Sequence, residues 1–276
     1  MIDYSKIYVN DFNAYDNKGN ERKIVKKFKT KIMYAPYEAK KCYNDLKNIF
    51  LRYGFKDKYT TRFETFKKND LVFRFYLNRS SFKMFFNQNI TDSRYHVKYS
   101  DSVSLEKTPY FIKLKSPRSL KLTKELVLNL INERKFREVK NFTEVDYLPL
   151  LIPNGEVIMQ KLGLKDYYLY DDITLKNIPK DIPYNFENYI PKYHLGNTEE
   201  KVYSTIYLDT LCDNFDDYSV INIETVQSLR LMNSGNALRI KGRGKIDKKL
   251  IIFADEFDDA ALRMIIHTNS TAVLVD

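Results

Sequence analysis

The residues best suited to chemistry form a group of cations, with two glycines among them, near the end of the chain. Between positions 239 and 249, Arg and Lys alternate with apolar residues and glycines, and Asp247 is the one acid among them. The group consists of Arg239, Lys241, Gly242, Arg243, Gly244, Lys245, Lys248 and Lys249. Alternate residues of a strand share a face, so these cations would line one side of a hairpin beside exposed glycine amides. Such a surface suits phosphate oxygens without base readout, although charge that protects an edge strand from aggregation explains the same pattern.

A second group of cations lies in the first half of the chain, on and between predicted strands. It consists of Arg62, Lys67, Lys68, Arg79, Lys113, Lys115, Arg118 and Lys121. Phe and Tyr are interleaved with these cations and with Arg74 and Lys83 on the strands, and aromatic side chains on a basic sheet can stack nucleobases. The Lys/Arg-Gly-Phe/Tyr signature of RNA-recognition sheets is absent, and rings at this density also build a core. The helix start at Ser116-Pro117 is either a further anion site or an ordinary cap.

The chain's positive charge is concentrated in its first half. The net charge is +10, and residues 1–138 hold 31 Lys and Arg against 15 Asp and Glu, whereas residues 139–199 and 200–276 are each slightly acidic. This asymmetry is typical of a domain that faces a polyanion. A solvated basic surface in a Lys-rich protein is the alternative.

The sequence carries none of the common catalytic or metal-binding motifs. Gly-x-Ser-x-Gly, a Walker loop, His-Glu-x-x-His and paired cysteines are all absent. Cys42 and Cys212 are far apart and are expected to be buried thiols, and His96, His194 and His267 stand apart from any ligand spacing. We therefore expect no enzymatic activity, no metal site and no cofactor.

Hydrophobic periodicity organises residues 24–138 into a basic α+β domain, after an irregular arm at residues 1–23. An edge strand is expected from Ile24 to Met33 and a helix from Tyr37 to Arg52. Further strands are expected at Tyr59–Phe66, Leu71–Leu77, Phe82–Phe86 and Tyr110–Lys115. A helix capped by Ser116 then runs to about Arg134. The domain is thus predicted to be an antiparallel sheet with flanking helices.

The second half is predicted to hold a connector at residues 139–200 and a smaller domain at residues 201–276. Prolines interrupt the connector, and one short helix is expected in it at Val157–Leu164. The smaller domain is predicted to contain Val202–Leu211 as a strand or helix, a helix at Glu224–Leu229, strands at Leu238–Lys241 and Leu250–Phe253, a helix at Asp258–His267 and a closing strand at Thr271–Val275. A chain of 276 residues exceeds what one core usually organises, so two domains are expected.

The stretch from Leu238 to Ala261 follows an ordered pattern: a strand, a Gly-x-Gly turn, a second strand and the start of a helix. The positions that carry the pattern are Gly242, Gly244, Ile246, Lys248, Leu250, Ala254, Phe257, Ala261 and Ile265. In this it resembles the C-terminal core of large-subunit ribosomal protein fifteen and its eighteen-e relatives. The resemblance implies a strand-helix-strand core and an RNA-associated role. The chain departs from that family in having Asn269-Ser270 in place of a Gly-Gly pair, Asp258 in place of a Ser or Thr cap, and no glycine-rich basic arm.

The first domain resembles a domain found in proteins of low-GC Gram-positive bacteria and their wall-less relatives. The residues that carry this resemblance are Thr61–Phe66, Asn78-Arg79-Ser80 and Pro109–Lys121. No activity is implied by it.

Together these features predict a non-catalytic RNA-binding or ribosome-associated accessory protein, whose partner is an RNA such as ribosomal RNA. The alternative is a protein-interaction scaffold that reuses a ribosomal-protein-like core without binding RNA. No apolar run approaches the ~20 residues of a membrane span and no signal-peptide pattern opens the chain, so we expect a cytoplasmic protein without a membrane partner.

Overall fold

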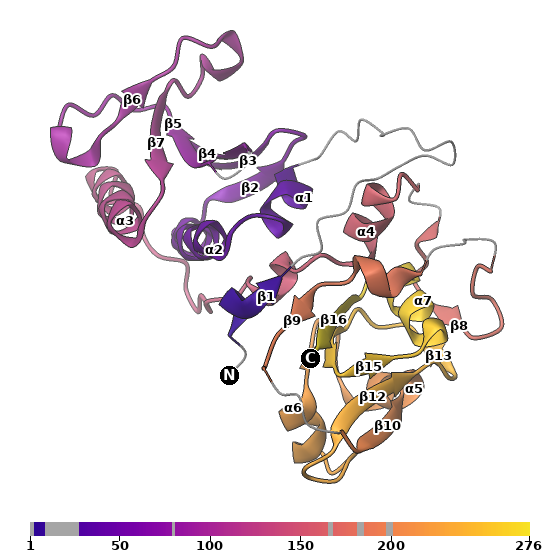
Figure 1. Cartoon of the computed structure of the whole chain (residues 1–276). Coiled ribbons are helices and arrows are strands. Elements are labelled where there is room, and N and C mark those ends of the chain that lie inside the picture. Colours follow the sequence, from indigo (N-terminus) through magenta and orange to yellow (C-terminus); the bar gives the residue numbers. More distant parts are fainter. Residues whose placement is uncertain (1–2, 9–27, 79–80, 165–167, 181–184, 197–200) are drawn as a thin grey trace. The chain divides into compact units, whose positions relative to one another are not determined.

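The computed structural model describes residues 3–8, 28–78, 81–164, 168–180, 185–196 and 201–276 (Figure 1). The chain divides into two compact units. We call residues 25–151 the N-terminal unit, and residues 1–24 together with 152–276 the C-terminal unit. Both contain helices and strands, which confirms the expected α+β class.

The N-terminal unit is built around an antiparallel sheet. In chain order its described residues form α1 (Phe28–Met33), α2 (Tyr37–Arg52), β2 (Lys56–Tyr59), β3 (Phe63–Lys68), β4 (Leu71–Asn78), β5 (Ser81–Phe86), β6 (Lys98–Tyr99), β7 (Tyr110–Leu114) and α3 (Pro117–Glu133). The strands are ordered β2-β3-β4-β5-β7-β6, and all neighbours run antiparallel. The expected meander of hairpins is therefore present.

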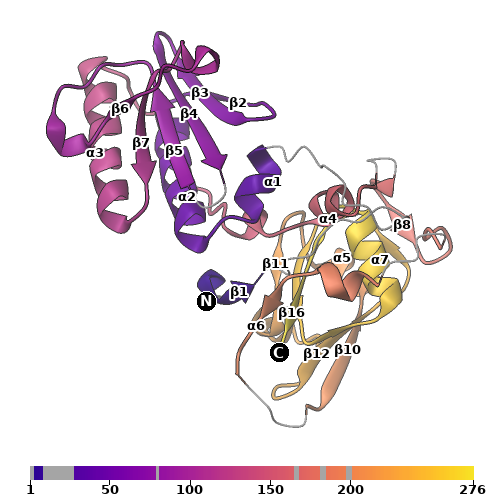
Figure 2. The ribbon, with the colours of Figure 1, turned by 45° about the horizontal axis from the view of Figure 1, so that its top comes forward.

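The core of the N-terminal unit lies between one face of this sheet and the helices. Helices α2 and α3 lie on the same side of the sheet (Figures 1 and 2). Phe50 of α2 packs against Phe66 and Phe73, with ring centroids 4.8 and 4.7 Å apart. Burial along β4 alternates strictly from residue 71 to residue 77, so every second side chain points away from this core. The sheet therefore has a second face that the core does not use.

Two helices of this unit begin and end where the sequence predicts. Helix α2 spans Tyr37–Arg52, and Gly54 follows it with a φ of +72°. Helix α3 starts at Pro117 because Ser116 forms a capping box with Ser119. The Ser119 amide donates a hydrogen bond to the Ser116 hydroxyl, 3.3 Å away, and the Ser116 amide donates one to the Ser119 hydroxyl.

Two expectations for the first domain are wrong in detail. The described part of the expected edge strand Ile24–Met33 is helix α1, because the buried residues Phe28 and Ile32 are four positions apart, which is the spacing of one helical turn. The expected strand Tyr59–Phe66 is divided into the end of β2 and the start of β3 by a turn at residues 60–62.

The C-terminal unit contains several short, mostly parallel sheets. In chain order its described residues form β1 (Ile7–Tyr8), α4 (Gly155–Lys161), β8 (Ile173–Thr174), β9 (Lys192–Tyr193), β10 (Tyr203–Tyr207), α5 (Leu208–Asn214), β11 (Val220–Ile221), α6 (Ile223–Ser228), β12 (Ala237–Lys241), β13 (Lys245–Ile246), β14 (Ile251–Ala254), β15 (Glu256–Phe257), α7 (Asp259–His267) and β16 (Thr271–Val275). One sheet has the order β1-β9-β16-β14-β11, and another has the parallel order β10-β12-β15.

The hairpin expected around Gly242-Arg243-Gly244 is absent, which is a correction to the sequence-based prediction. Strand β12 pairs in parallel with β10 and β15, whereas β14 pairs in parallel with β11 and β16. Between them the chain forms β13, which pairs with β8 from the expected connector. The two strands are correctly located, but each finds its partners among elements distant in sequence.

Residues 139–200, expected as a connector, are divided between the two units. Residues 139–151 belong to the N-terminal unit, where the Asn48 side chain bonds both the amide and the carbonyl of Val145. Residues from 152 onward belong to the C-terminal unit and supply core residues such as Ile158, Ile173 and Phe186. The expected short helix is present as α4. Of the N-terminal arm, residues 7–8 form β1, which pairs with β9.

Candidate functional site

The face of the N-terminal sheet that points away from the core is where rings and cations gather. Residues paired directly across antiparallel strands lie on the same face, so the strand register defines it. We call this set the open face, and it consists of Lys56, Lys58, Phe63, Thr65, Lys67, Val72, Arg74, Tyr76, Asn78, Ser81, Lys83, Phe85, Lys98, Phe111 and Lys113. No Asp or Glu occupies an open-face position in the described strands.

Four aromatic side chains form a cluster on the open face. Phe85 is at its centre, with its ring centroid 5.0 Å from that of Phe111, 6.1 Å from that of Tyr76 and 6.4 Å from that of Phe63. Phe85 is 3% exposed yet does not belong to the core on the opposite face, while the other three rings are half-buried. The half-buried rings therefore offer aromatic surface to solvent on the side of the sheet away from the helices.

The cations beside these rings have no carboxylate partner among the described residues. The guanidinium of Arg74 lies 5.7 Å from the Phe63 ring centroid, and the Lys83 ammonium lies 5.0 Å from that of Phe111. Burial and the neighbouring charge of Lys113 lower the pKa of Lys83 below its ordinary value. Lys83 thus sits in a locally positive field that an anion would relieve.

A cavity of about 530 Å³ opens beside the ring cluster. It is lined by Lys31, Arg62, Phe63, Tyr76, Lys83, Phe85, Ser100, Ser102, Ser104, Leu105 and Phe111. The Lys31 ammonium, from α1, lies 5.9 Å from the Tyr76 ring centroid. The loop after β6 supplies the serines, and the hydroxyls of Ser102 and Ser104 lie 3.0 Å apart. The cavity thus combines ring faces, hydroxyls and cations.

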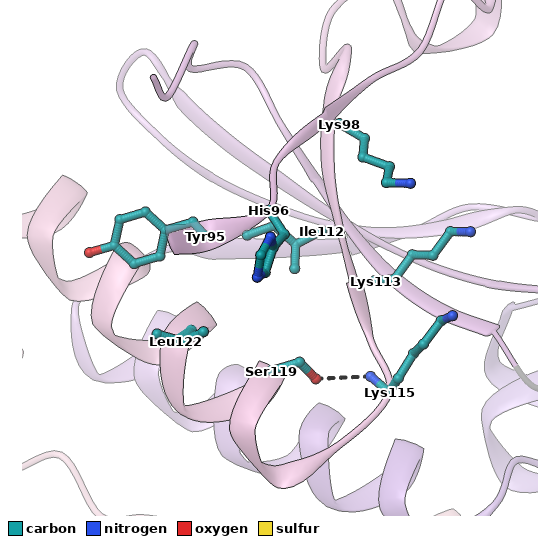
Figure 3. Close-up of a pocket in the computed structure, with 8 residues that line it drawn as sticks. All are labelled: Tyr95, His96, Lys98, Ile112, Lys113, Lys115, Ser119 and Leu122. Carbon is teal, nitrogen blue, oxygen red and sulfur yellow. Dashed lines mark hydrogen bonds between the residues drawn. The ribbon is translucent and has the colours of Figure 1, made fainter. Parts of the chain in front are cut away.

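A smaller cavity of about 210 Å³ lies at the β6 edge of the same sheet. It is lined by Tyr95, His96, Lys98, Ile112, Lys113, Lys115, Ser119 and Leu122 (Figure 3). Figure 3 shows the side chains of Lys98, Lys113 and Lys115 extending to the same side, and no ion pair joins any of the three to a described residue. These lysines extend the positive surface of the open face beyond the ring cluster.

The structure brings together about half of the cations predicted in the first domain. Lys67 and Lys113 are on the open face, while Arg62 and Lys115 adjoin it as cavity residues. Arg79 lies outside the described residues.

Three predicted cations lie elsewhere in the unit. The Lys68 ammonium donates to the Tyr53 carbonyl and lies 4.7 Å from the Phe136 ring centroid, away from the open face. Lys121 lies in the groove between α2 and α3, where Glu38 and Asp45 also lie. Arg118 is exposed in the first turn of α3.

The sequence-based prediction of the site omitted several open-face and cavity cations. These are Lys31, Lys56, Lys58 and Lys98. Arg74 and Lys83 were expected beside Phe and Tyr on the strands, and they stand on the open face because the opposite face of β4 and β5 is apolar. Strand alternation is the signal that could have assigned them to this face. Lys31 had no such signal, because its segment was taken for a strand.

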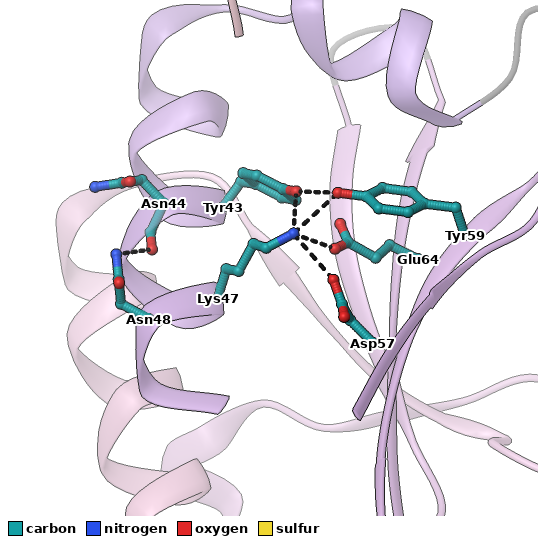
Figure 4. Close-up of polar contacts among 7 residues, drawn as sticks. All are labelled: Tyr43, Asn44, Lys47, Asn48, Asp57, Tyr59 and Glu64. Carbon is teal, nitrogen blue, oxygen red and sulfur yellow. Dashed lines mark hydrogen bonds and ion pairs between the residues drawn. The ribbon is translucent and has the colours of Figure 1, made fainter. Parts of the chain in front are cut away.

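On the core face of the same sheet, by contrast, a buried lysine is paired with acids. Lys47 of α2 is 5% exposed, and its ammonium lies 2.7 Å from Glu64 and 3.3 Å from Asp57 (Figure 4). It also donates to the hydroxyls of Tyr43 and Tyr59. Burial is the largest single influence and disfavours the charged ammonium, but the charges of Glu64 and Tyr59 and the hydrogen bonds to them together outweigh burial and raise the pKa of Lys47 above its ordinary value. This cluster fastens α2 to β2 and β3.

Most cations of the segment 239–249 contact other residues of the C-terminal unit, and both arginines form ion pairs there. The Arg239 guanidinium lies 2.7 Å from Glu256 and stacks 4.3 Å from the Tyr203 ring centroid. Arg243 lies 2.9 Å from Asp209, an ion pair that lowers the pKa of the Asp209 carboxyl.

The four lysines of this segment differ in their contacts. The Lys245 ammonium lies 2.9 Å from Asp172 and 3.4 Å from Asp247. The Lys248 ammonium donates to the carbonyls of Cys212 and Phe215 at the end of α5. Lys241 and Lys249 make no ion pair with a described residue. Three of the segment's six cations, Arg239, Arg243 and Lys245, are therefore paired with carboxylates.

The glycines of this segment are explained by packing. A Cβ at Gly242 would lie 2.8–2.9 Å from atoms of Ala260 and 2.9 Å from the Ala261 nitrogen, and the Gly242 amide donates to the Asp258 side chain. Gly244 has a φ of +65°, and a Cβ there would meet Asp209. The Gly242 amide expected to face a phosphate therefore serves the fold.

Other sequence-based expectations hold in both units. In the C-terminal unit, Asp258 caps α7 by accepting a hydrogen bond from the Ala261 amide, and Asn269 after this helix takes a φ of +61°, a conformation that asparagine tolerates. Cys42 and Cys212 are both buried free thiols.

No family model matches the chain. The resemblance of residues 238–261 to ribosomal protein fifteen therefore stays a prediction. Within the described parts of the chain, no helix has the length and apolar character required to cross a membrane.

Proposed function

We propose that the N-terminal unit binds single-stranded RNA on its open face, which makes the chain a non-catalytic RNA-binding protein. The observation that carries the proposal is the pairing of rings and cations on the same sheet face without an acid among the described positions. Rings stack bases and cations neutralise phosphates, and a single strand presents both to a sheet. A duplex hides its bases from such a surface.

The C-terminal unit has a different place in this proposal. Its internal ion pairs support a packing role for the segment 239–249, as the scaffold alternative expects, so we do not extend the RNA surface to that segment. The resemblance of residues 238–261 to ribosomal protein fifteen makes ribosomal RNA the first RNA to test, and a ribosome-associated role is proposed on that basis.

The proposal is tested by fluorescence anisotropy of the full-length chain with a labelled single-stranded RNA over a salt series. We expect affinity to fall as salt rises, by about 0.7 log units per log unit of salt for each phosphate neutralised. A variant carrying Arg62→Gln, Lys83→Gln and Lys113→Gln should lower that slope by about two. The matched variant, with Arg239→Gln, Lys241→Gln and Lys245→Gln, removes the same charge and should bind as the wild type does.

The rings are tested separately, with Tyr76→Leu and Phe111→Leu. Each should weaken binding by about 1–3 kcal/mol, the contribution of one stacked base, while the salt slope stays unchanged. The proposal is overturned if the wild type does not bind at low salt, or if the two triple variants lose affinity equally.

A further inference from the structure

The cavity beside the ring cluster has a volume suited to one nucleotide or another small molecule. Its volume, about 530 Å³, falls within the ~300–1,000 Å³ of ordinary small-molecule sites. Half-buried rings and Leu105 give it apolar surface on which a base can stack. The cavity therefore holds features that a plain charged surface lacks, and its hydrogen-bonding groups can discriminate between bases.

The charged groups that line this cavity are all donors. Lys31, Arg62 and Lys83 carry ammonium or guanidinium groups, which donate hydrogen bonds and accept none. No Asp, Glu, Asn or Gln is among the described lining residues, and Asp101 is not one of them although it lies between two lining serines.

The serine hydroxyls are the only side-chain acceptors apart from the Tyr76 hydroxyl. Ser102 and Ser104 already contact each other across 3.0 Å, which uses part of their capacity. A base edge that presents amino hydrogens would find few acceptors here and would meet fixed positive charge. A base edge that presents carbonyl oxygen would find charged donors, which make the stronger hydrogen bonds.

We infer that this cavity selects a base with a carbonyl oxygen at the position where adenine and cytosine carry an amino group, namely guanine or uracil. The inference rests on the proposed function, because it assumes that a single strand crosses the open face. Guanine offers the O6 and N7 acceptor pair that Arg side chains commonly contact, and uracil offers O4.

The test compares matched strands in the anisotropy assay, uridine against cytidine and inosine against adenosine. Each pair keeps ring size constant and exchanges a carbonyl for an amino group. We expect the carbonyl-bearing strand of each pair to bind about 5- to 150-fold more tightly, since a good two-point contact discriminates by roughly 1–3 kcal/mol. Stacking strength does not predict this order, because adenine stacks at least as well as hypoxanthine.

Two single variants test whether the preference between bases arises in the cavity. Arg62→Gln replaces a donor in the cavity by an amide that can also accept, so it should reduce the preference severalfold. Lys67→Gln removes an open-face cation outside the cavity, so it should weaken all strands alike and leave the ratio unchanged. Equal binding of the strands within each pair, or a preference for adenosine and cytidine, overturns the inference while the proposed function stands. Failure of every strand to bind overturns both.

Discussion

The open face and the segment 239–249 are both rich in cations, but the fold pairs several cations of the segment with acids and pairs none of Arg74, Lys83 and Lys113 with a described acid. In the segment, Arg239, Arg243 and Lys245 face carboxylates contributed by other elements of the C-terminal unit. On the open face, Arg74 and Lys83 have rings and other cations as their cross-strand neighbours. Local density of Lys and Arg is thus a poor guide to a binding surface. The residues that the fold places opposite each cation decide whether its charge is available.

Paired and unpaired cations affect the stability of the fold differently. A paired cation contributes to the stability of the fold, whereas cations that crowd one another without acids lower it through repulsion and desolvation. Unpaired charge kept on one sheet face is the kind of local cost that proteins carry at functional sites. The comparison therefore predicts a larger loss of stability when a cation engaged by the fold is removed than when an open-face cation is removed.

The largest effect is expected for the buried cation on the core face. Lys47→Met leaves Glu64 buried without its counter-charge, so we expect a loss of about 3–5 kcal/mol in the free energy of unfolding, measured with urea. Lys47→Met combined with Glu64→Leu should recover most of that loss, because an apolar pair replaces the ion pair. If the single variant is as stable as the wild type, the cluster does not fasten α2 to the sheet.

An intermediate effect should separate a cation engaged by the fold from one on the open face. Lys248→Met leaves the Cys212 and Phe215 carbonyls without their donor, so we expect a loss of about 1–3 kcal/mol in urea unfolding. Lys83→Met removes a cation with no described acid partner, and stability should change by no more than about 0.5 kcal/mol. Equal losses in the two variants would contradict the distinction drawn here.

The smallest effect is expected at an exposed ion pair of the segment. Arg243 holds the pKa of Asp209 below its ordinary value of 3.8, so the stabilisation from this pair is complete above that value and is lost as pH falls through the lowered pKa. Arg243→Gln should therefore lower the thermal midpoint slightly at neutral pH and not at acid pH. A difference between the proteins that grows on acidification would exclude this ion pair as its cause.

Much of the local structure follows from sequence pattern. The spacing of apolar residues in Tyr37–Arg52, ended by Gly54, gave α2 with its bounds, and Ser116-Pro117 gave the start of α3. These predictions succeed because caps and helical periodicity act between residues a few positions apart. The prediction failed at Phe28–Met33, where alternating Lys residues concealed a helical spacing of the buried side chains.

Sequence alone determined most of the segments that become helices and strands, that cations concentrate in the first half, and that rings accompany them. It did not determine which cations would be free, because that depends on partners brought in from far along the chain. Asp209 meets Arg243 only once β10 and β12 have paired in parallel, and Asp172 meets Lys245 only once β8 and β13 have paired antiparallel. The two faces of the N-terminal sheet were separated by tertiary structure for the same reason. Strand register and helix packing together assign Phe73 to the core and Phe63 to the open face.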